Sequence, residues 1–127
     1  MAKGRGSANS ATALVGVMML CLLINGQLVE SAIYTVGGGG GWTFNTVGWP
    51  KGKSFRAGDV LVFKYSPAAH DVVPVNAAGY RSCNAPRGSK KFKSGNDRIR
   101  LRRGTNYFIC SFAGHCQAGM KMAVRAA

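Results

Sequence analysis

The chain is poor in histidine, in acidic side chains and in long apolar segments. Two histidines and four acidic residues stand against 17 lysines and arginines, which gives a formal net charge of +13. No Asn-x-Ser/Thr acceptor occurs, so we do not expect N-glycosylation. The apolar run 14–24 is short for a membrane span and no stop-transfer pattern follows it. The C-terminus has no hydrophobic tail of the kind that precedes a GPI anchor, so we expect no membrane anchor.

The N-terminus predicts a secretory signal peptide over residues 1–31. Lys3 and Arg5 give it a positive start, the run 14–24 is its apolar core, and small residues end it. An uncleaved anchor is the alternative. Cleavage leaves residues 32–127, a single domain with one modest core and a formal net charge of +12. Such a charge favours anionic polymers, membrane surfaces or acidic redox proteins as partners.

Both histidines belong to a pattern of soft metal ligands. Cys110, His115 and Met120 follow the spacing C-x4-H-x4-M, and His70 lies upstream. Two imidazoles, a thiolate and a weak axial thioether are the ligands of a blue copper site. We therefore predict one type 1 copper ion held by these four residues. No histidine remains for the trinuclear cluster of a multicopper oxidase or for a Ser-His-Asp triad, so we do not expect an enzyme.

Some assignments around this pattern have alternatives. A zinc site built from cysteine and histidine is one, although secretion and the thioether argue against it. Met122 shares a strand face with Met120 and is the nearest rival for the axial position; the spacing from His115 favours Met120, and we assign Met122 to the core. Phe108 and Phe112 either wall the site and limit water access or are ordinary core residues.

The predicted mature domain contains three cysteines, an odd number for an oxidising compartment. If Cys110 binds a metal, Cys83 and Cys116 are free to form a disulfide. The alternative pairs Cys110 with one of the other two and leaves the histidine and methionine pattern without a purpose.

From Ile33 onward the chain consists of short strand patterns broken by glycine and proline. We expect Trp42 and Phe44 to alternate inward and residues 76–82 to hold a short helical turn. The expected strands cover residues 33–36, 60–65, 71–75, 97–102, 107–111 and 120–124. Short strands at this spacing predict an all-β, two-sheet sandwich with Greek-key connections.

Four segments together resemble the phytocyanins. They are Tyr34-Thr-Val-Gly through Trp42-Thr-Phe44-Asn45, His70-Asp71-Val72-Val73, Tyr107-Phe108-Ile109-Cys110, and Gly114-His115-Cys116 through Gly119-Met120-Lys121. The resemblance covers the whole mature domain. Met120 in place of glutamine, and no proline- or serine-rich stalk, point to the plantacyanin or basic blue protein branch. The resemblance implies a cupredoxin fold, one type 1 copper and a disulfide between Cys83 and Cys116.

Asp71 follows the ligand His70, where many cupredoxins have asparagine. We expect its side chain to accept a hydrogen bond from the backbone or the hydroxyl of Ser111. Such a bond would tie together the two loops that carry the ligands.

The function that these residues predict is that of a small secreted electron carrier, which cycles one copper between Cu(I) and Cu(II) in the plant apoplast or cell wall. We expect a monomer with an unknown, acidic redox partner. The alternative is an extracellular matrix-associated signalling or adhesion protein that uses its basic surface, with copper mainly structural.

The basic residues predict a cationic surface that could bind an anionic partner. Anionic cell-wall polysaccharide is the expected neighbour, nucleic acid is not expected outside the cell, and a merely solvated face is the simpler alternative. The surface comprises Lys90, Lys91, Lys93, Arg98, Arg100, Arg102 and Arg103.

Overall fold

The computed structural model describes residues 30–127. The predicted signal peptide, residues 1–31, lies outside the described residues except for its last two. Residues Ser31–Ala127 form one unit. No helix in this part of the chain has the length and hydropathy needed to cross a membrane.

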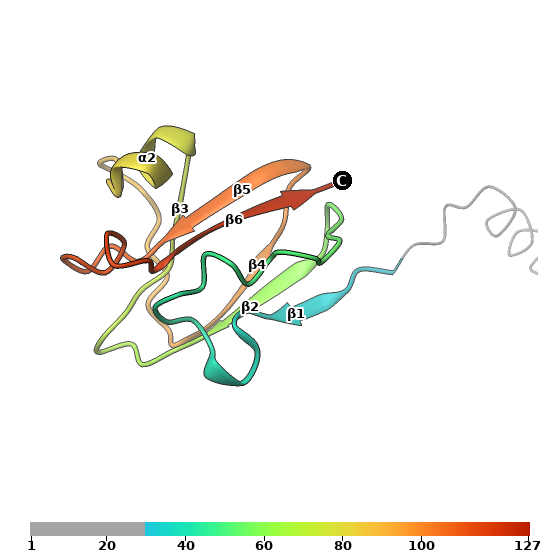
Figure 1. The fold of residues 1–127 in the computed structure, drawn as a ribbon, viewed down its shortest axis with the longest axis horizontal. Helices are drawn as coiled ribbons and strands as arrows, with labels where there is room; N and C mark the ends of the chain where they lie inside the picture. Colours follow the sequence, from blue (N-terminus) through green and yellow to red (C-terminus); the bar gives the residue numbers. More distant parts are fainter. Residues whose placement is uncertain (1–29) are drawn as a thin grey trace, which may run out of the picture. The chain divides into compact units, whose positions relative to one another are not determined.

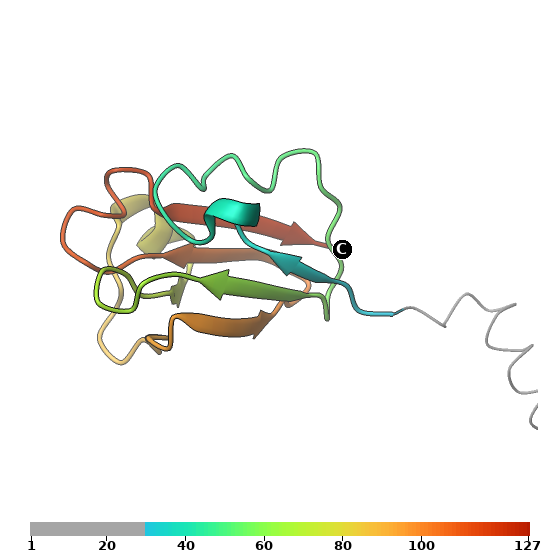
Figure 2. The ribbon, with the colours of Figure 1, turned by 90° about the horizontal axis from the view of Figure 1, so that it is seen from below.

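Within residues 30–127, six strands form two three-stranded sheets (Figure 1). In the first sheet the central strand β2 (Val60–Lys64) pairs in parallel with β1 (Ile33–Thr35) and antiparallel with β4 (Asn96–Arg100). The second sheet is antiparallel, with β5 between β3 and β6; its strands span Val73–Val75 (β3), Gly104–Ile109 (β5) and Lys121–Ala126 (β6). Figure 2 shows the strands of both sheets running along the same long axis. The predicted all-β sandwich is confirmed.

The core lies between the two sheets. Along β6, Met122, Val124 and Ala126 are buried while the residues between them are not, which is the period of two expected when one strand face packs inward. The rings of Phe63 on β2 and Phe108 on β5 lie 5.1 Å apart between centroids and so join the two sheets. This core fixes how the ends of β5 and β6 lie relative to β2.

The expected inward alternation of Trp42 and Phe44 is wrong for Phe44. Trp42 is 1% exposed, whereas Phe44 is 38% exposed. Residues 43–45 form no strand, and Asn45 has a positive φ of 65°. Because side chains alternate between two faces only in an extended backbone, the turn carries Phe44 outward.

The described residues also contain two short helices, η1 (Gly38–Gly40) and α2 (Ala77–Ser82). The predicted helical turn corresponds to α2. Its N-cap Asn76 accepts a hydrogen bond from the Gly79 amide at 2.8 Å. No side chain fits at Gly79, since a Cβ there would lie 2.7 Å from the Asn84 carbonyl oxygen.

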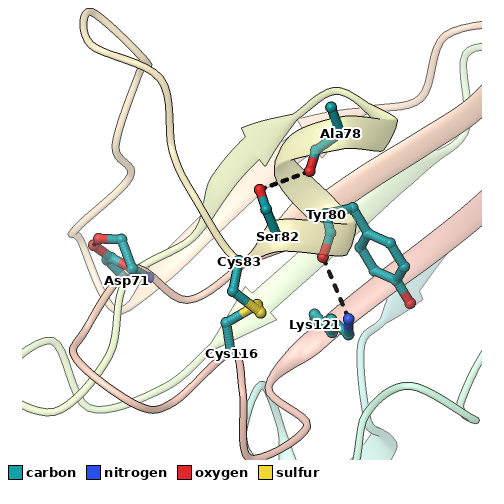
Figure 3. The surroundings of a disulfide bond; sticks show 8 residues. Asp71, Ala78, Tyr80, Ser82, Cys83, Cys116 and Lys121 are labelled. Carbon is teal, nitrogen blue, oxygen red and sulfur yellow. Dashed lines mark hydrogen bonds between the residues drawn. A yellow bond between two sulfur atoms is a disulfide. The ribbon is translucent and has the colours of Figure 1, made fainter.

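A disulfide joins α2 to the loop between β5 and β6 (Figure 3). It links Cys83, the C-cap of α2, to Cys116, with 5.6 Å between their Cα atoms. Nearby, the Lys121 ammonium donates to the Tyr80 carbonyl and lies 4.5 Å from the centroid of the Tyr80 ring. The loop that contains His115 is therefore attached covalently to the helix.

Replacing both Cys83 and Cys116 with alanine should lower the free energy of unfolding by about 2 to 5 kcal/mol, because the bond closes a long loop in the unfolded chain. Urea unfolding of the metal-free protein, followed by tryptophan fluorescence, measures this loss. Ser82→Ala, an exposed change beside the bond, is the control and should cost no more than about 0.5 kcal/mol. A double variant as stable as this control would contradict the prediction.

Candidate metal centre

Three metal-binding side chains meet, and they come from the loop before β3 and the loop between β5 and β6. Figure 1 shows the loop between β5 and β6 at the end of the sandwich remote from the C-terminus. His70 precedes β3, Cys110 directly follows β5, and His115 lies in the loop between β5 and β6. The Nδ1 atoms of His70 and His115 are 3.1 Å apart, and the Cys110 Sγ is 3.6 Å from the His115 Nδ1. All the candidate donor atoms lie within 4.8 Å of one another. The sequence-predicted ligands thus converge from segments far apart in the chain.

The backbone of Met120 is hydrogen-bonded to two of these residues. It precedes β6 and is fully buried. Its carbonyl accepts from the Cys110 amide at 3.1 Å, and its own amide donates to the His115 carbonyl at 3.0 Å. Met122 is also fully buried but lies opposite Phe108 in the strand register. These contacts favour Met120 over Met122 for the axial position.

The donor set fits one copper ion. Two donors that each lie about 2.0 to 2.3 Å from a metal are separated by no more than about 4.6 Å, and the separations from His115 fall within that limit. One thiol, two imidazoles and a neighbouring thioether match the softness of a type 1 copper site. Cys110 is the free cysteine of the described residues, as a thiolate ligand must be.

The Asp71 carboxylate ties together the loops that carry His70 and Cys110. It is 1% exposed. One oxygen accepts from the Ser111 amide at 2.7 Å and the other from the Ser111 hydroxyl at 2.5 Å. The Asp71 carbonyl also accepts from the Trp42 indole at 2.8 Å. Both hydrogen bonds proposed from the sequence are present and join the two ligand loops to each other. The bond from the Trp42 indole anchors Asp71 to the core.

Burial sets the protonation state of the ligands. It raises the pKa of the Cys110 thiol, although hydrogen bonds from the backbone of Asp71 and Phe112 act in the opposite direction. Burial also lowers the pKa of His70; the neighbouring His115 adds to this decrease and the Asp71 carboxylate opposes it. At neutral pH the metal-free site therefore contains a neutral His70 and a protonated thiol, which must lose its proton when a metal binds.

Aromatic rings surround the two histidines. Phe112 stacks on His115 with 5.7 Å between centroids. Phe44 contacts both imidazoles, at 4.9 Å from His115 and 5.7 Å from His70. Phe108 is instead a core residue, buried against Phe63. The contact of Phe44 was missed by sequence reasoning, and the signal that could have found it is Asn45, because asparagine is common in turns and tolerates the positive φ seen here.

Comparison with known proteins agrees with this geometry. A family model described as a plastocyanin-like domain matches residues 42–120. The chain belongs to the phytocyanin family. It is 65% identical over 127 residues to a chemocyanin of Lilium longiflorum, covering 100% of both chains, and 56% identical to a basic blue protein of Arabidopsis thaliana, covering 99% of each. The solved structure of cucumber basic protein, a blue copper protein, superposes with a TM-score of 0.74 at 60% identity and covers 76% of this chain and 100% of that one. The resemblance drawn from the sequence is confirmed.

Part of the cationic surface of this phytocyanin lines a groove that contains none of the metal ligands. All seven predicted residues of that surface are exposed. Four of them line a groove on the side of the sandwich, namely Lys90, Arg100, Arg102 and Arg103. Neither histidine, nor Cys110 or Met120, lines this groove.

Asp71→Ala should lower the free energy of unfolding of the metal-free phytocyanin by about 2 to 4 kcal/mol, because two donors of Ser111 lose a charged acceptor. Ser111→Ala removes the hydroxyl bond and leaves one oxygen of the buried carboxylate without a donor, so it should cost about 1.5 to 3 kcal/mol. Urea unfolding of both variants provides the comparison. A loss below about 0.5 kcal/mol in Asp71→Ala would contradict the prediction.

Copper binding near neutral pH should release about one proton, because the thiol with the raised pKa must ionise while His70 is already neutral. A titration with Cu(I) under nitrogen in weak buffer, read with a pH indicator, counts the protons. Cys110→Ser is the control and should release none. Release of no proton by the parent protein would mean that the thiol is already ionised or does not bind the metal.

Proposed function

We propose that this phytocyanin is a small secreted electron carrier, with one copper held by His70, Cys110 and His115 and with Met120 as the weak axial ligand. The observation that carries the proposal is the convergence of the three donor atoms within 4.8 Å. Copper bound there would supply single-electron transfer by moving between Cu(I) and Cu(II), and a mixed nitrogen and sulfur ligand set serves both states.

The loops around the site are held without help from a metal. The Asp71 carboxylate binds Ser111, the disulfide fixes Cys116, and the backbone of Met120 joins Cys110 to His115. Ligands held in place in this way rearrange little when the charge of the metal changes, so the barrier to electron transfer stays low. A metal needed only for structure would add little here, and so we favour the redox role over the matrix-associated signalling or adhesion role.

The electron would leave or enter through the histidine end of the molecule. Both imidazoles are partly exposed, and Phe44, Ala113 and Gly114 give the nearby surface an apolar character. We propose that a redox partner docks on this surface. The net charge of +12 on residues 32–127 would attract acidic groups of that partner and so speed its association. A single apolar contact surface suits a monomeric carrier that binds its partner transiently.

We further propose that the protein acts outside the cell, in the plant apoplast or cell wall, and is not an enzyme. The disulfide is typical of an oxidising compartment, as is the predicted signal peptide. Both histidines belong to the proposed copper site, so no imidazole remains for a second copper cluster or for acid-base catalysis.

The direct test is the visible spectrum of the copper-loaded domain. The parent protein should show an intense blue charge-transfer band that disappears on reduction and returns on oxidation, whereas Cys110→Ser should be colourless. A folded, copper-loaded parent without this band would contradict the proposal. A band that cannot be cycled would leave copper binding standing but would contradict electron transfer.

The axial assignment has its own test in two matched variants. Met120→Leu should keep the blue band but shift the reduction potential, because the axial thioether tunes the copper. Met122→Leu, a change of the same size at another fully buried methionine, should leave the potential nearly unchanged. Voltammetry of both proteins distinguishes them. A shift confined to Met122→Leu would overturn the assignment.

A further inference from the structure

The sandwich has an open side between the edge strands β3 and β4. A groove of about 560 Å³ lies there, lined by residues of β3, β4 and β5 and by the segment around Phe92. Its volume falls within the range of about 300 to 1,000 Å³ that is usual for ligand sites. On the other side, Phe55 bridges to Ala126 and packs on Tyr34, so that side is covered.

The groove is cationic and has no acidic counterpart. Its four basic side chains are Lys90, Arg100, Arg102 and Arg103, all exposed. The acidic side chains of residues 32–127 are Asp59, Asp71 and Asp97, and each is at most 7% exposed.

These three carboxylates are already engaged inside the domain. Asp59 accepts from the amides of Ala32 and Arg56, and Asp97 accepts from the hydroxyls of Tyr65 and Ser94. Asp71 is bound to Ser111, as described above. Within residues 32–127 no acidic side chain is left to neutralise the groove, so an anion from outside would meet four unpaired cations.

Two of these cations sit on a turn that is held rigidly. The Asn106 side chain accepts from the Arg102 amide at 3.0 Å and donates to the Arg102 carbonyl at 2.8 Å, while Gly104 takes a positive φ of 99°. The guanidinium groups of Arg102 and Arg103 make no hydrogen bond to any described part of the chain. Arginines pair with carboxylates through two parallel hydrogen bonds. Here the backbone that carries them does not have to be ordered on binding, although the two free side chains do.

The rings in the groove argue against nucleic acid as the occupant. Phe92 is held by two backbone bonds to Val72, and the Lys90 ammonium lies 4.7 Å from its centroid. The Tyr107 ring packs on Tyr80 at 5.2 Å. Since each ring is already partly occupied, neither offers the free platform on which bases stack. A polymer that presents carboxylates at intervals fits better.

The two arginines and the ligand Cys110 lie at opposite ends of β5. This strand begins at Gly104, beside the two arginines, and ends just before Cys110. Six residues at about 3.4 Å each give a separation of roughly 20 Å. A ligand on the arginines therefore leaves the histidine end exposed.

We propose that this groove binds a linear polyuronate through its carboxylates, with Arg102 and Arg103 as the main contacts. The protein would then bind an acidic polysaccharide through the face between β3 and β4, while the end that carries the histidines stays free to meet a redox partner. This inference does not depend on the proposed electron transfer.

The test uses the copper-loaded domain and a short, de-esterified oligogalacturonate in isothermal titration calorimetry. Arg102→Gln/Arg103→Gln should weaken binding by about tenfold or more, because it removes the two charge-assisted contacts. Lys51→Gln/Lys64→Gln removes the same charge at exposed positions outside the groove and should weaken binding by less than about threefold. Equal losses of affinity in the two double variants would overturn the proposal in favour of general charge attraction. Unchanged affinity in both would overturn it as well, because neither site would then bind the oligomer.

Two further probes separate the ligand classes. The fully methyl-esterified oligomer should not bind measurably, since it lacks the carboxylates. An oligodeoxynucleotide of equal charge should bind more weakly than the uronate, and tighter binding of the nucleotide would overturn the proposal. The blue band and the reduction potential should be the same in all variants, so a failure of the groove proposal is distinguishable from a failure of the copper site.

Discussion

The hydrogen bonds between Asp71 and Ser111 are the constraint on which the site depends. They join the residue after one ligand, His70, to the residue after another, Cys110, across two loops that are far apart in the chain. A buried carboxylate provides two strong acceptors, and both of its oxygens are used here. The Trp42 indole holds the same residue through its carbonyl, so the sandwich core and the ligand loops are coupled directly. A site built in this way can be fully formed before copper arrives.

Three of the four ligands and the strands could be predicted because their patterns are local in the sequence. His70 lies far upstream and could be assigned because the chain contains only one other histidine. The C-x4-H-x4-M spacing reflects the short loop between β5 and β6, in which the backbone of Met120 meets both Cys110 and His115. The strands could be located because alternating burial leaves a period of two, as in β6. The disulfide was implied by the family resemblance and is present in the structure.

Features that arise from turns or from the meeting of two sheets could not be predicted in this way. Phe44 was assigned to the interior because alternation was extended across a turn, and it lies instead against the two histidines. The groove forms between β3 and β4, which are edge strands of different sheets. It could not be predicted from any single segment of the sequence. The basic residues were visible in the sequence, but the burial of every aspartate, which leaves them unpaired, was not.

The most direct test of the account is the rate of electron self-exchange between the Cu(I) and Cu(II) forms. NMR line widths in mixtures of the two forms measure this rate, and high salt is needed to screen the repulsion between molecules of like charge. A prebuilt site near the surface predicts that Cu(I) resonances around His115 broaden in proportion to the added Cu(II) form. Sharp lines at every mixing ratio would contradict the account, because they would mean that the site must rearrange, or is too remote, to pass an electron.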